Sequence, residues 1–354
     1  MPIREQIHKQ DSVLDVMRNR ILSKTWKPGE RIAPHTNLAT QMGVSSFTVQ
    51  RALEVLTQDG FTTSATRKGT YVSLFPPHLC RYALVFHHAL QDRGWTRFWT
   101  ALRDEAALLS CPPECDIRVF FGIDGHLDTY DYGVLEKDVR AKRLAGIIFT
   151  SNPIGLEKTP LLLDKTLPRV AISSGASSLW ETVNLDLNRF IDRALDDLFA
   201  QGRRNVAIIT PCLPDSPYGQ HIFRAVAERG MTLRPYRFQT VDASTPEAAR
   251  NCAHLLLHDP ENRPDALIIT DDNLVEYASA GVILSGAKAP QDVAVIAHCN
   301  FPWPAPSVIP VHRLGYDARQ VLNLCVDRIN AQRRGETLAP CAPVLPLFEE
   351  ELNP

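Results

Sequence analysis

The chain has 354 residues, of which 44% are hydrophobic and 22% are charged, and its formal net charge is −2. This length exceeds one typical domain, and the composition is that of an ordinary soluble globular protein. No apolar run approaches the roughly 18–20 residues of a membrane span, and no signal-peptide stretch begins the chain, so we expect a cytoplasmic location.

The charges are unevenly distributed along the chain. Residues 1–75 hold ten Lys or Arg against six Asp or Glu, whereas residues 76–354 hold 28 against 34. A basic N-terminal part on an acidic body suits a module that binds a polyanion. The eight cysteines are scattered, and the one close pair, Cys111 and Cys115, lacks further ligands at metal-site spacing. We therefore expect free thiols, no metal and no cofactor.

Three short helices are expected first along the chain. Asp11 or Ser12 would cap the first, Gly43 would end the second, and the third would run from about Ser46 to Gln58. Their apolar faces are Leu14, Met17, Ile21 and Leu22; then Leu38, Ala39 and Met42; then Val49, Ala52, Leu53 and Leu56. Two strands, 61–63 and 70–74, follow around a turn at 66–69, which predicts a winged helix-turn-helix in residues 1–75.

A joint and a larger second domain follow. Phe75-Pro76-Pro77-His78 predicts a stiff, extended linker, which we place at residues 76–79. Continuous apolar runs then alternate with amphipathic helical stretches over residues 80–354, as in parallel sheets covered on both faces. The runs are 82–86, 117–121, 146–149, 169–172, 206–209, 266–269 and 293–297, and the helical stretches are 99–109, 189–200, 218–229, 246–257 and 274–284. The pattern predicts an α/β body of two lobes.

Residues 12–73 carry an ordered set of motifs. The motifs are Trp26-Lys27-Pro28-Gly29-Glu30-Arg31-Ile32, Leu38-Ala39, Gly43-Val44-Ser45, Thr48-Val49-Gln50-Arg51-Ala52-Leu53, Gly60 and Gly69-Thr70-Tyr71-Val72. In order and spacing this set resembles the DNA-binding heads of the GntR family. The resemblance implies a partner, double-stranded operator DNA.

The candidate DNA contacts lie before the second helix, on the third helix and on the hairpin turn. They are Arg31, Thr36, Ser45, Ser46, Phe47, Thr48, Gln50, Arg51, Arg67, Lys68 and Gly69. Ser45 can cap the third helix and meet a phosphate, while Gln50 can pair with adenine and Arg51 with guanine or a phosphate. Each of these side chains would otherwise be a solvated surface residue.

The sequence departs from the usual GntR pattern at its recognition surface. Thr36, Ser46 and Gln50 stand where the family usually has arginines, Phe47 replaces a small polar residue, and Arg67 replaces a wing glycine. Fewer arginines predict less guanine readout, and Phe47 can contact a thymine methyl group. The operator is therefore expected to differ from the usual one.

Three segments of the body carry a second resemblance: Val183-Asn184-Leu185-Asp186 through to Ile209, Pro264–Asp272, and Gly281 onward to Ile296. They resemble the effector domains of the LacI family, which share the periplasmic-binding-protein fold. In that fold a ligand binds between the lobes, at the carboxyl ends of the strands. The candidate ligand-binding residues are His87, His88, Trp95, Trp99, Ser151, Asn152, Ser173, Asp186, Asp271, Asp272 and Asn300.

Other interpretations of these residues remain open. Gly219 lies where the family often has an arginine that holds sugar hydroxyls, and Cys299 lies where a carboxylate is common. The ligand is thus a sugar, a related metabolite or another molecule, or the pocket is unused. Asp272 would serve equally as a helix cap, and His87 and His88 as the end of a strand.

The sequence thus predicts a DNA-binding transcription regulator, a repressor by family analogy, that works as a homodimer on a two-fold operator. No enzyme motif is found, and the body is too short for the aminotransferase-like domains that some GntR heads carry. The alternative is a DNA-binding scaffold whose body serves dimerisation or protein interaction without a small ligand.

Overall fold

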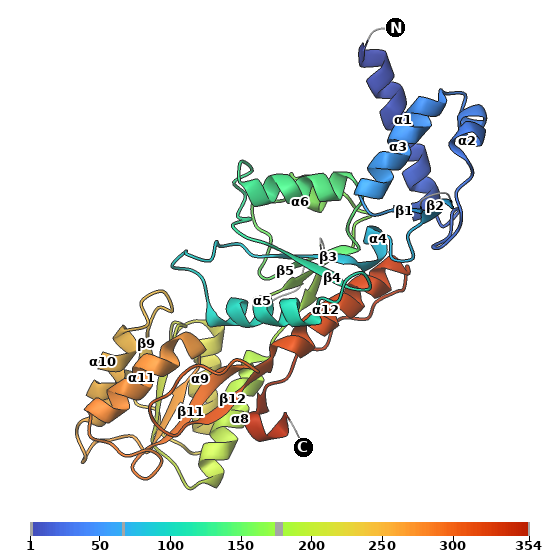
Figure 1. Ribbon diagram of the computed structural model, residues 1–354. Coiled ribbons are helices and arrows are strands. Elements are labelled where there is room, and N and C mark those ends of the chain that lie inside the picture. The colour runs from blue at the N-terminus through green and yellow to red at the C-terminus, as the bar shows by residue number, and fades with distance from the viewer. Residues whose placement is uncertain (1–2, 66–67, 174–179, 353–354) are drawn as a thin grey trace.

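The computed structural model describes residues 3–65, 68–173 and 180–352. Over these ranges the chain forms a small N-terminal head and a body of two lobes, each built around a mainly parallel sheet. The head lies at one end of the elongated molecule beside the first lobe, and the second lobe lies at the other end (Figure 1). Among the described residues, no helix is both long enough and apolar enough to cross a bilayer.

The head packs three helices and a hairpin around one small core. Its elements are α1 (Ile3–Leu22), α2 (His35–Met42), α3 (Ser46–Gln58), β1 (Thr62–Ala65) and β2 (Gly69–Val72). Met17, Val49 and Leu56 are fully buried between the helices, and Phe61 closes the core where the chain leaves α3 for the hairpin. β1 and β2 pair antiparallel, with Thr62 opposite Val72. This is the winged helix-turn-helix that the sequence predicts.

The start of α1 corrects one expectation. Asp11 and Ser12, predicted as N-caps, lie inside a helix that begins eight residues earlier, at Ile3. The helix was predicted from its apolar stripe. This stripe lies in the part of α1 that packs into the head core, where Val13, Met17 and Ile21 are buried. Residues 3–12 contain no proline or glycine, so nothing in their sequence ends the helix at that point.

The joint between head and body is also different from the extended linker that was predicted. Pro77–Cys80 forms a one-turn helix, α4, whose first residue is a proline. Proline is tolerated there because the first turn of a helix needs no N–H from that residue. The His78 ring stacks on Phe61 of the head at 5.8 Å, and Arg333 of the body donates to the carbonyl oxygen of Leu79 at 2.6 Å. The joint is therefore packed on both sides.

The first lobe is a five-stranded parallel sheet in the order β4-β3-β5-β6-β7. Its helices α5 and α6 cover opposite faces, because alternate residues of each strand point to opposite sides. The elements are β3 (Arg81–Val85), α5 (Arg97–Leu109), β4 (Asp116–Phe120), α6 (Tyr130–Arg140), β5 (Gly146–Phe149), α7 (Pro160–Leu163), β6 (Arg169–Ile172) and β7 (Glu181–Val183).

The second lobe is a six-stranded sheet in the order β13-β12-β11-β10-β8-β9, in which only the edge strand β13 is antiparallel. Helices α8 and α9 cover one face, and α10 and α11 the other. The elements are α8 (Leu187–Ala200), β8 (Val206–Thr210), α9 (Pro217–Glu228), η1 (Pro235–Arg237), β9 (Phe238–Thr240), α10 (Ala248–Leu257), β10 (Ala266–Ile269), α11 (Asp272–Leu284), β11 (Ala294–Phe301), β12 (His312–Asp317), β13 (Leu347–Phe348) and η2 (Glu349–Glu351).

The chain returns to the first lobe through a long helix, α12 (Ala318–Arg333), which starts at the end of β12. Its far end packs on the first sheet, where Asn330 accepts a hydrogen bond from the Tyr82 hydroxyl at 2.8 Å and Gln332 pairs with the backbone of Arg169. The segment after α12 then leads back to β13 in the second lobe. These crossings join the lobes into one two-lobed body.

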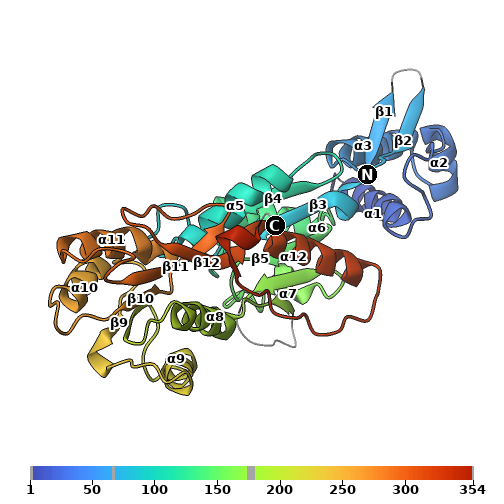
Figure 2. The same ribbon diagram turned by 90° about the horizontal axis from the view of Figure 1, so that it is seen from below.

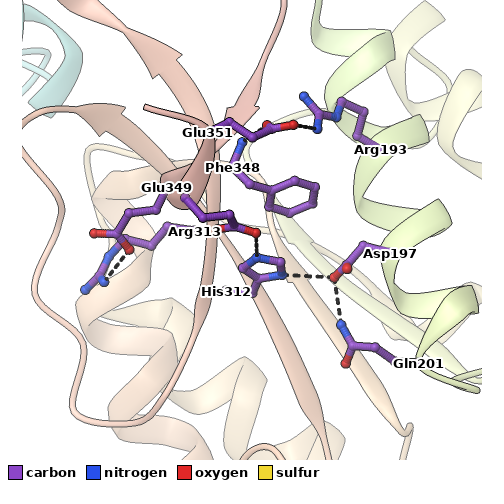
Figure 3. A network of polar contacts seen from close by, with 9 residues as sticks. Arg193, Asp197, Gln201, His312, Arg313, Phe348, Glu349 and Glu351 are labelled. Atoms are coloured by element: carbon purple, nitrogen blue, oxygen red, sulfur yellow. Dashed lines mark hydrogen bonds and ion pairs between the residues drawn. The ribbon is translucent and has the colours of Figure 1, made fainter. Parts of the chain in front are cut away.

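A network of polar contacts fastens the C-terminal segment to the second lobe (Figure 3). The imidazole of His312 lies between two carboxylates, 3.0 Å from Asp197 and 3.0 Å from Glu350, and stacks on the ring of Phe348 at 4.2 Å. Arg193 of α8 donates to Glu351 at 2.6 Å. The network thus connects β12, α8 and the last residues of the chain.

The His312 contacts predict a pH-dependent contribution to stability. Burial acts to lower the pKa of His312, but the hydrogen bonds with Glu350 and Asp197 outweigh it and hold the pKa above 6.5. The charged ring therefore contributes its full stabilisation below about pH 6.5, and the contribution is lost as pH rises through the raised pKa. We expect His312→Gln to lower the free energy of unfolding by about 1 kcal/mol at pH 6, because the ring is partly solvated.

Urea unfolding of wild type and variant from pH 5.5 to 9 measures this difference, which should shrink toward the alkaline end. His258→Gln, at an exposed histidine of the same lobe, is the matched control and should show no such trend. A difference between wild type and His312→Gln that stays constant with pH would show that His312 acts by packing alone.

Candidate functional site

The first candidate site is the outer face of α3 in the head. Ser45 caps this helix, since its hydroxyl accepts the backbone N–H of Thr48 at 3.1 Å and lies 2.8 Å from the Thr48 hydroxyl. The buried face fixes the rotation of the helix, so Phe47, Gln50 and Arg51 are left exposed. Phe47 is 70% exposed, an unusual state for a large apolar ring that serves no partner.

One acidic residue on this face was not among the predicted contacts. The Glu54 carboxylate accepts a hydrogen bond from Gln50 at 3.2 Å and lies 3.7 Å from the Arg51 guanidinium. Arg51 also lies over the Phe47 ring, at 5.9 Å from its centroid. Glu54 thus holds both predicted base-reading side chains in place, and its position one helical turn after Gln50 is the sequence signal for this role.

The other predicted DNA contacts flank this helix. Thr36 is exposed in α2, and Lys68 and Gly69 are exposed where the hairpin begins β2. Arg31 forms a bridge with Tyr71 of β2, and its guanidinium lies beside Gly69, which has φ +105°. Arg31 is therefore part of the hairpin surface and not of the α2 surface. Arg67 lies outside the described residues.

The second candidate site is a cavity of about 340 Å³ between the two lobes of the body. The loop before α5 and its first turn supply the wall on the first lobe, and the strand ends of β8, β10 and β11 supply the other wall. The lining residues are Thr96, Phe98, Leu185, Leu187, Thr210, Pro211, Cys212, Tyr218, Thr270, Asp271, Asp272, Asn273, His298 and Asn300. Of the predicted ligand-binding residues, Asp271, Asp272 and Asn300 are thus brought together here.

Four other predicted ligand residues form an aromatic cluster behind the first-lobe wall. The rings of Trp95 and Trp99 pack on Phe86 at 4.9 and 6.3 Å, and His88 lies 5.4 Å from Trp99 and 4.9 Å from His87. The two indole N–H groups are used inside the lobe, by the Thr100 hydroxyl and the Thr150 carbonyl. None of the four rings lines the cavity.

The remaining predicted ligand residues also lie away from the cavity lining. The Asp186 carboxylate caps α8 by accepting the Arg189 N–H at 2.9 Å, although its neighbours Leu185 and Leu187 reach the cavity. Ser151 and Asn152 follow β5, and Ser173 follows β6, so all three lie at the carboxyl ends of strands of the first sheet. Ser174, the neighbour of Ser173, lies outside the described residues.

The sequence left two roles open for Asp272, a helix cap and a ligand contact. In the structure the cap is Asp271, and Asp272 faces the cavity. Asp271 is the N-cap of α11, since its carboxylate accepts the Asn273 N–H at 2.9 Å. Asp272 is buried and accepts a hydrogen bond from the Asn300 amide at 2.6 Å. Burial, and then the Asp271 charge, raise the pKa of Asp272 to about 7. Asp272 is therefore a buried carboxyl group close to its charge transition at neutral pH.

Two further side chains make the floor of the cavity polar. The Nδ1 atom of His298 and the Oδ1 atom of Asn300 are buried and have no hydrogen-bond partner within the described ranges. Burial lowers the pKa of His298 to about 4, so the ring is neutral at pH 7. Buried polar atoms without partners are uncommon in folded proteins and are often satisfied by a ligand or water. His298 was missed from the sequence because its strand reads as apolar.

The position at which an arginine is common in related pockets is closed to side chains. A Cβ atom at Gly219 would lie 2.2 Å from the Leu213 carbonyl oxygen and 2.6 Å from that of Pro214. These are backbone atoms at the start of α9, so they cannot move aside without moving the turn. The backbone around residue 219 therefore leaves no room for an arginine side chain.

Contacts at the mouth of the cavity join the lobes. The backbone N–H of Arg97 donates to the Asn273 side chain at 3.0 Å, and its guanidinium donates to Glu276 at 3.2 Å. Deeper along α5, the fully buried Glu105 accepts hydrogen bonds from Trp303 at 3.0 Å and from Arg319 at 2.7 Å. Trp303 therefore packs between the lobes and does not line the cavity. These bonds hold the lobes in the arrangement seen in Figure 2.

Comparisons with known proteins agree with this division of the chain. Residues 9–72 match the family model of bacterial regulatory proteins of the gntR family, and residues 195–345 match the periplasmic binding protein-like domain. A comparison with curated proteins finds no match.

Solved structures of LacI-type regulators resemble the chain in fold, although their sequence identity is low. A LacI family regulator from Lactobacillus casei, with bound sucrose, has 16% identity and a TM-score of 0.55, over 76% of this chain and 98% of its own. A LacI family regulatory protein from Chloroflexus aggregans has 18% and 0.56, over 76% and 96%. The Escherichia coli transcriptional repressor ascG has 16% and 0.57, over 76% and 97%. At such identities the likeness establishes the fold alone.

Proposed function

We propose that this chain, which joins a DNA-binding domain of the gntR regulatory family to a periplasmic-binding-protein-like body, regulates transcription in response to a small molecule held between the lobes. The observation that carries the proposal is the pairing of an exposed recognition helix with a cavity whose floor holds buried polar atoms without partners. In this proposal the protein binds DNA in the cytoplasm and has no catalytic role.

The proposed effector is a small polar metabolite, such as a sugar or a sugar-like compound. The Lactobacillus casei relative was crystallised with sucrose, which supports a ligand of this kind in the same fold. Ligand binding between the lobes would change the angle between them, and the first lobe carries the head. Repression is the proposed sign, as for the ascG repressor, because a protein bound at an operator can block transcription without further contacts.

We further propose that the regulator is a homodimer. Support comes from the outer face of the second lobe, where α10, α11 and the loop against α11 expose large apolar side chains. They are Leu255, Tyr277, Ile283, Leu284 and Val308. Exposed apolar side chains of this size gain nothing in a monomer, whereas a second copy packed on α10 and α11 would bury them. A two-fold dimer would place two heads on a palindromic operator.

Selection from random duplexes tests the proposed DNA recognition. We expect a palindromic consensus that is bound with a steep dependence on salt, because phosphate contacts release counterions. Gln50→Ala and Arg51→Ala should each relax the choice of base at one position and weaken operator binding about 10–100-fold, since a lost base contact costs about 1–3 kcal/mol.

Gln58→Ala, at the exposed far end of the same helix, is the matched control and should bind like wild type. If Gln50→Ala and Arg51→Ala weaken binding equally on all duplexes, these side chains contact only phosphates. If no duplex is enriched in the selection, the proposed function is wrong.

A further inference from the structure

Several hydrogen-bond donors in the cavity are already used within the protein. The Asn300 amide donates to Asp272 at 2.6 Å, and the Asn273 amide donates to Asp271 at 2.7 Å. The Thr270 hydroxyl donates to Thr210 at 2.7 Å, and Thr210 donates in turn to the Cys212 sulfur at 3.3 Å. Both threonine hydroxyls and one N–H of each amide are therefore used inside the protein, and the second N–H of each amide is left over.

Two acceptor atoms beside the carboxyl groups of the cavity stay open. Asn300 is 1% exposed, yet its Oδ1 atom receives no hydrogen bond from any residue that the structure describes. The backbone N–H and the side-chain amide of Asn273 both donate to Oδ1 of Asp271. The Oδ2 atom of Asp271 receives no hydrogen bond from a residue that the structure describes. A ligand that completes this set must donate hydrogen bonds.

The charge of the cavity also favours a ligand that donates hydrogen bonds. Asp271 and Asp272 are in the lining, and none of the described lining residues is Lys or Arg. The guanidinium of Arg97, at the mouth, is paired with Glu276, and the backbone of the turn excludes any side chain at Gly219. Two neighbouring carboxyl groups without a cation in the lining disfavour an anionic ligand and favour a positive one.

We propose that the cavity takes a small organic cation, whose protonated amino group lies against Asp271, Asp272 and the Oδ1 atom of Asn300. An ammonium group has three donors and no acceptor, whereas each sugar hydroxyl also brings acceptor lone pairs. This inference rests on the proposed function, because it takes the cavity to be the effector site.

The rest of the ligand is apolar or weakly polar. Phe98, Leu185 and Leu187 line the cavity, and the partly buried ring of Tyr218 adds a phenol whose pKa burial raises, so that it stays a neutral hydroxyl. A cavity of about 340 Å³ holds a ring or a short chain beside the amino group. A carboxylate or phosphate on the ligand would meet Asp271 and Asp272 and is excluded by repulsion.

Matched sets of compounds that differ mainly in charge test this inference on the full chain. One set is glucosamine, glucose and glucuronate, and the other is tyramine, tyrosol and hydroxyphenylacetate. We expect the cationic member of at least one set to raise the Tm by several degrees, and its neutral and anionic partners to have no such effect. A larger or equal shift with a neutral or anionic member, or no shift in either set, overturns the inference.

Variants connect the response to the carboxyl groups. Asp272→Asn keeps the shape and removes the charge, and it should abolish the shift given by the cation. Asp215→Asn, at an exposed carboxyl group of the same lobe, should leave the shift intact. Calorimetry in buffers of different ionisation enthalpy gives a second measurement. Binding of a cation should release protons near pH 7, because it lowers the pKa of Asp272 from about 7. A shift that survives in Asp272→Asn also overturns the inference.

The same samples separate this inference from the proposed function. Binding to the selected operator is measured first, without any added compound. If the protein binds no operator, the proposed function fails. If it binds the operator but shows no preference for cations, only the present inference fails.

Discussion

Replacing Asp272 by asparagine is expected to stabilise the protein by about 2–4 kcal/mol above pH 7. Burial, and then the Asp271 charge, raise the pKa of Asp272 from its ordinary 3.8 to about 7 in the folded protein. The contribution of Asp272 to the free energy of unfolding is therefore highest below about pH 4, and this contribution falls as pH rises toward 7. Asparagine carries no charge at any pH, so the variant escapes this loss.

The measurement is the difference in the free energy of unfolding between wild type and Asp272→Asn, from pH 4 to pH 8. Other titrating groups, including His298, contribute equally to both proteins and cancel. We expect the difference to grow as pH rises and to level off above pH 7. Asp215→Asn is the control and should give a difference near zero throughout. A difference between wild type and Asp272→Asn that does not change with pH would show that the folded protein does not raise the pKa of Asp272.

A stabilising change at this position would also say something about function. Proteins keep destabilising charges mainly where a ligand or a reaction needs them. The Asp272 carboxyl group is buried, lies beside a second carboxyl group and faces a cavity. A loss of ligand response together with a gain in stability would identify the cavity as a site selected for binding.

Removing the Arg143 side chain is expected to destabilise the protein by about 3 kcal/mol, through the loss of its ion pair with Asp138, and also to weaken the contact between head and body. Arg143 lies between α6 and β5, and its guanidinium binds Asp138 of the body at 2.6 Å and Asp59 of the head at 2.8 Å. Asp59 follows the recognition helix α3 and also contacts Arg18 at 3.4 Å. The side chain of Asp138 is 2% exposed, so Arg143→Ala would leave a buried carboxylate without its partner.

A double-mutant cycle with Asp138→Asn measures this interaction. The double variant should be less destabilised than the two single variants together, because a neutral amide in place of the Asp138 carboxylate needs no cation. Arg140→Ala, which removes an exposed ion pair with Glu136 in the same segment, should cost only a few tenths of a kcal/mol. Hydrogen exchange in α3 should rise in Arg143→Ala and not in Arg140→Ala. Purely additive effects would count against a shared ion pair.

The contacts at this junction connect the body to the end of α3. A cavity of about 470 Å³ lies between the end of α1, the joint and the first lobe, with Asn19, His78, Asp164 and Arg333 in its lining. The head is thus held by a few polar contacts beside unfilled space, and is not fused to the body by a continuous apolar core.

The strands that the sequence predicted are those whose residues are apolar on both faces. All seven predicted runs are strands: four begin at the predicted residue, three begin one residue away, and β11 ends four residues later than predicted. Strands β7, β9, β12 and β13 and helices α6 and α12 were among the elements that were not predicted, because they are short or carry charged and polar residues, such as His312 and Arg313 in β12. Their polar side chains find partners that only the folded chain provides.

The candidate ligand residues were predicted by their position after a strand, and this rule succeeded only in part. Asp271, Asp272 and Asn300 follow or end strands of the second sheet, and these residues meet in the cavity. His87 and Trp95 also follow a strand, but the Trp95 ring packs on Phe86 inside the lobe and the His87 ring packs on His88. The direction of a loop depends on what it can bury, which sequence position does not state.

The amino-acid sequence by itself determined the division into a basic head and an α/β body, the order of the elements of the head, and the residues exposed on the recognition helix. These features depend on local apolar spacing, capping and turn residues, so they are written in neighbouring positions. Only the tertiary structure decided which strand-end side chains share a cavity, that Glu54 holds Gln50 and Arg51, and that Asp272 is buried without a cation in the lining. Those features depend on distances and on exclusion of water between segments far apart in the chain.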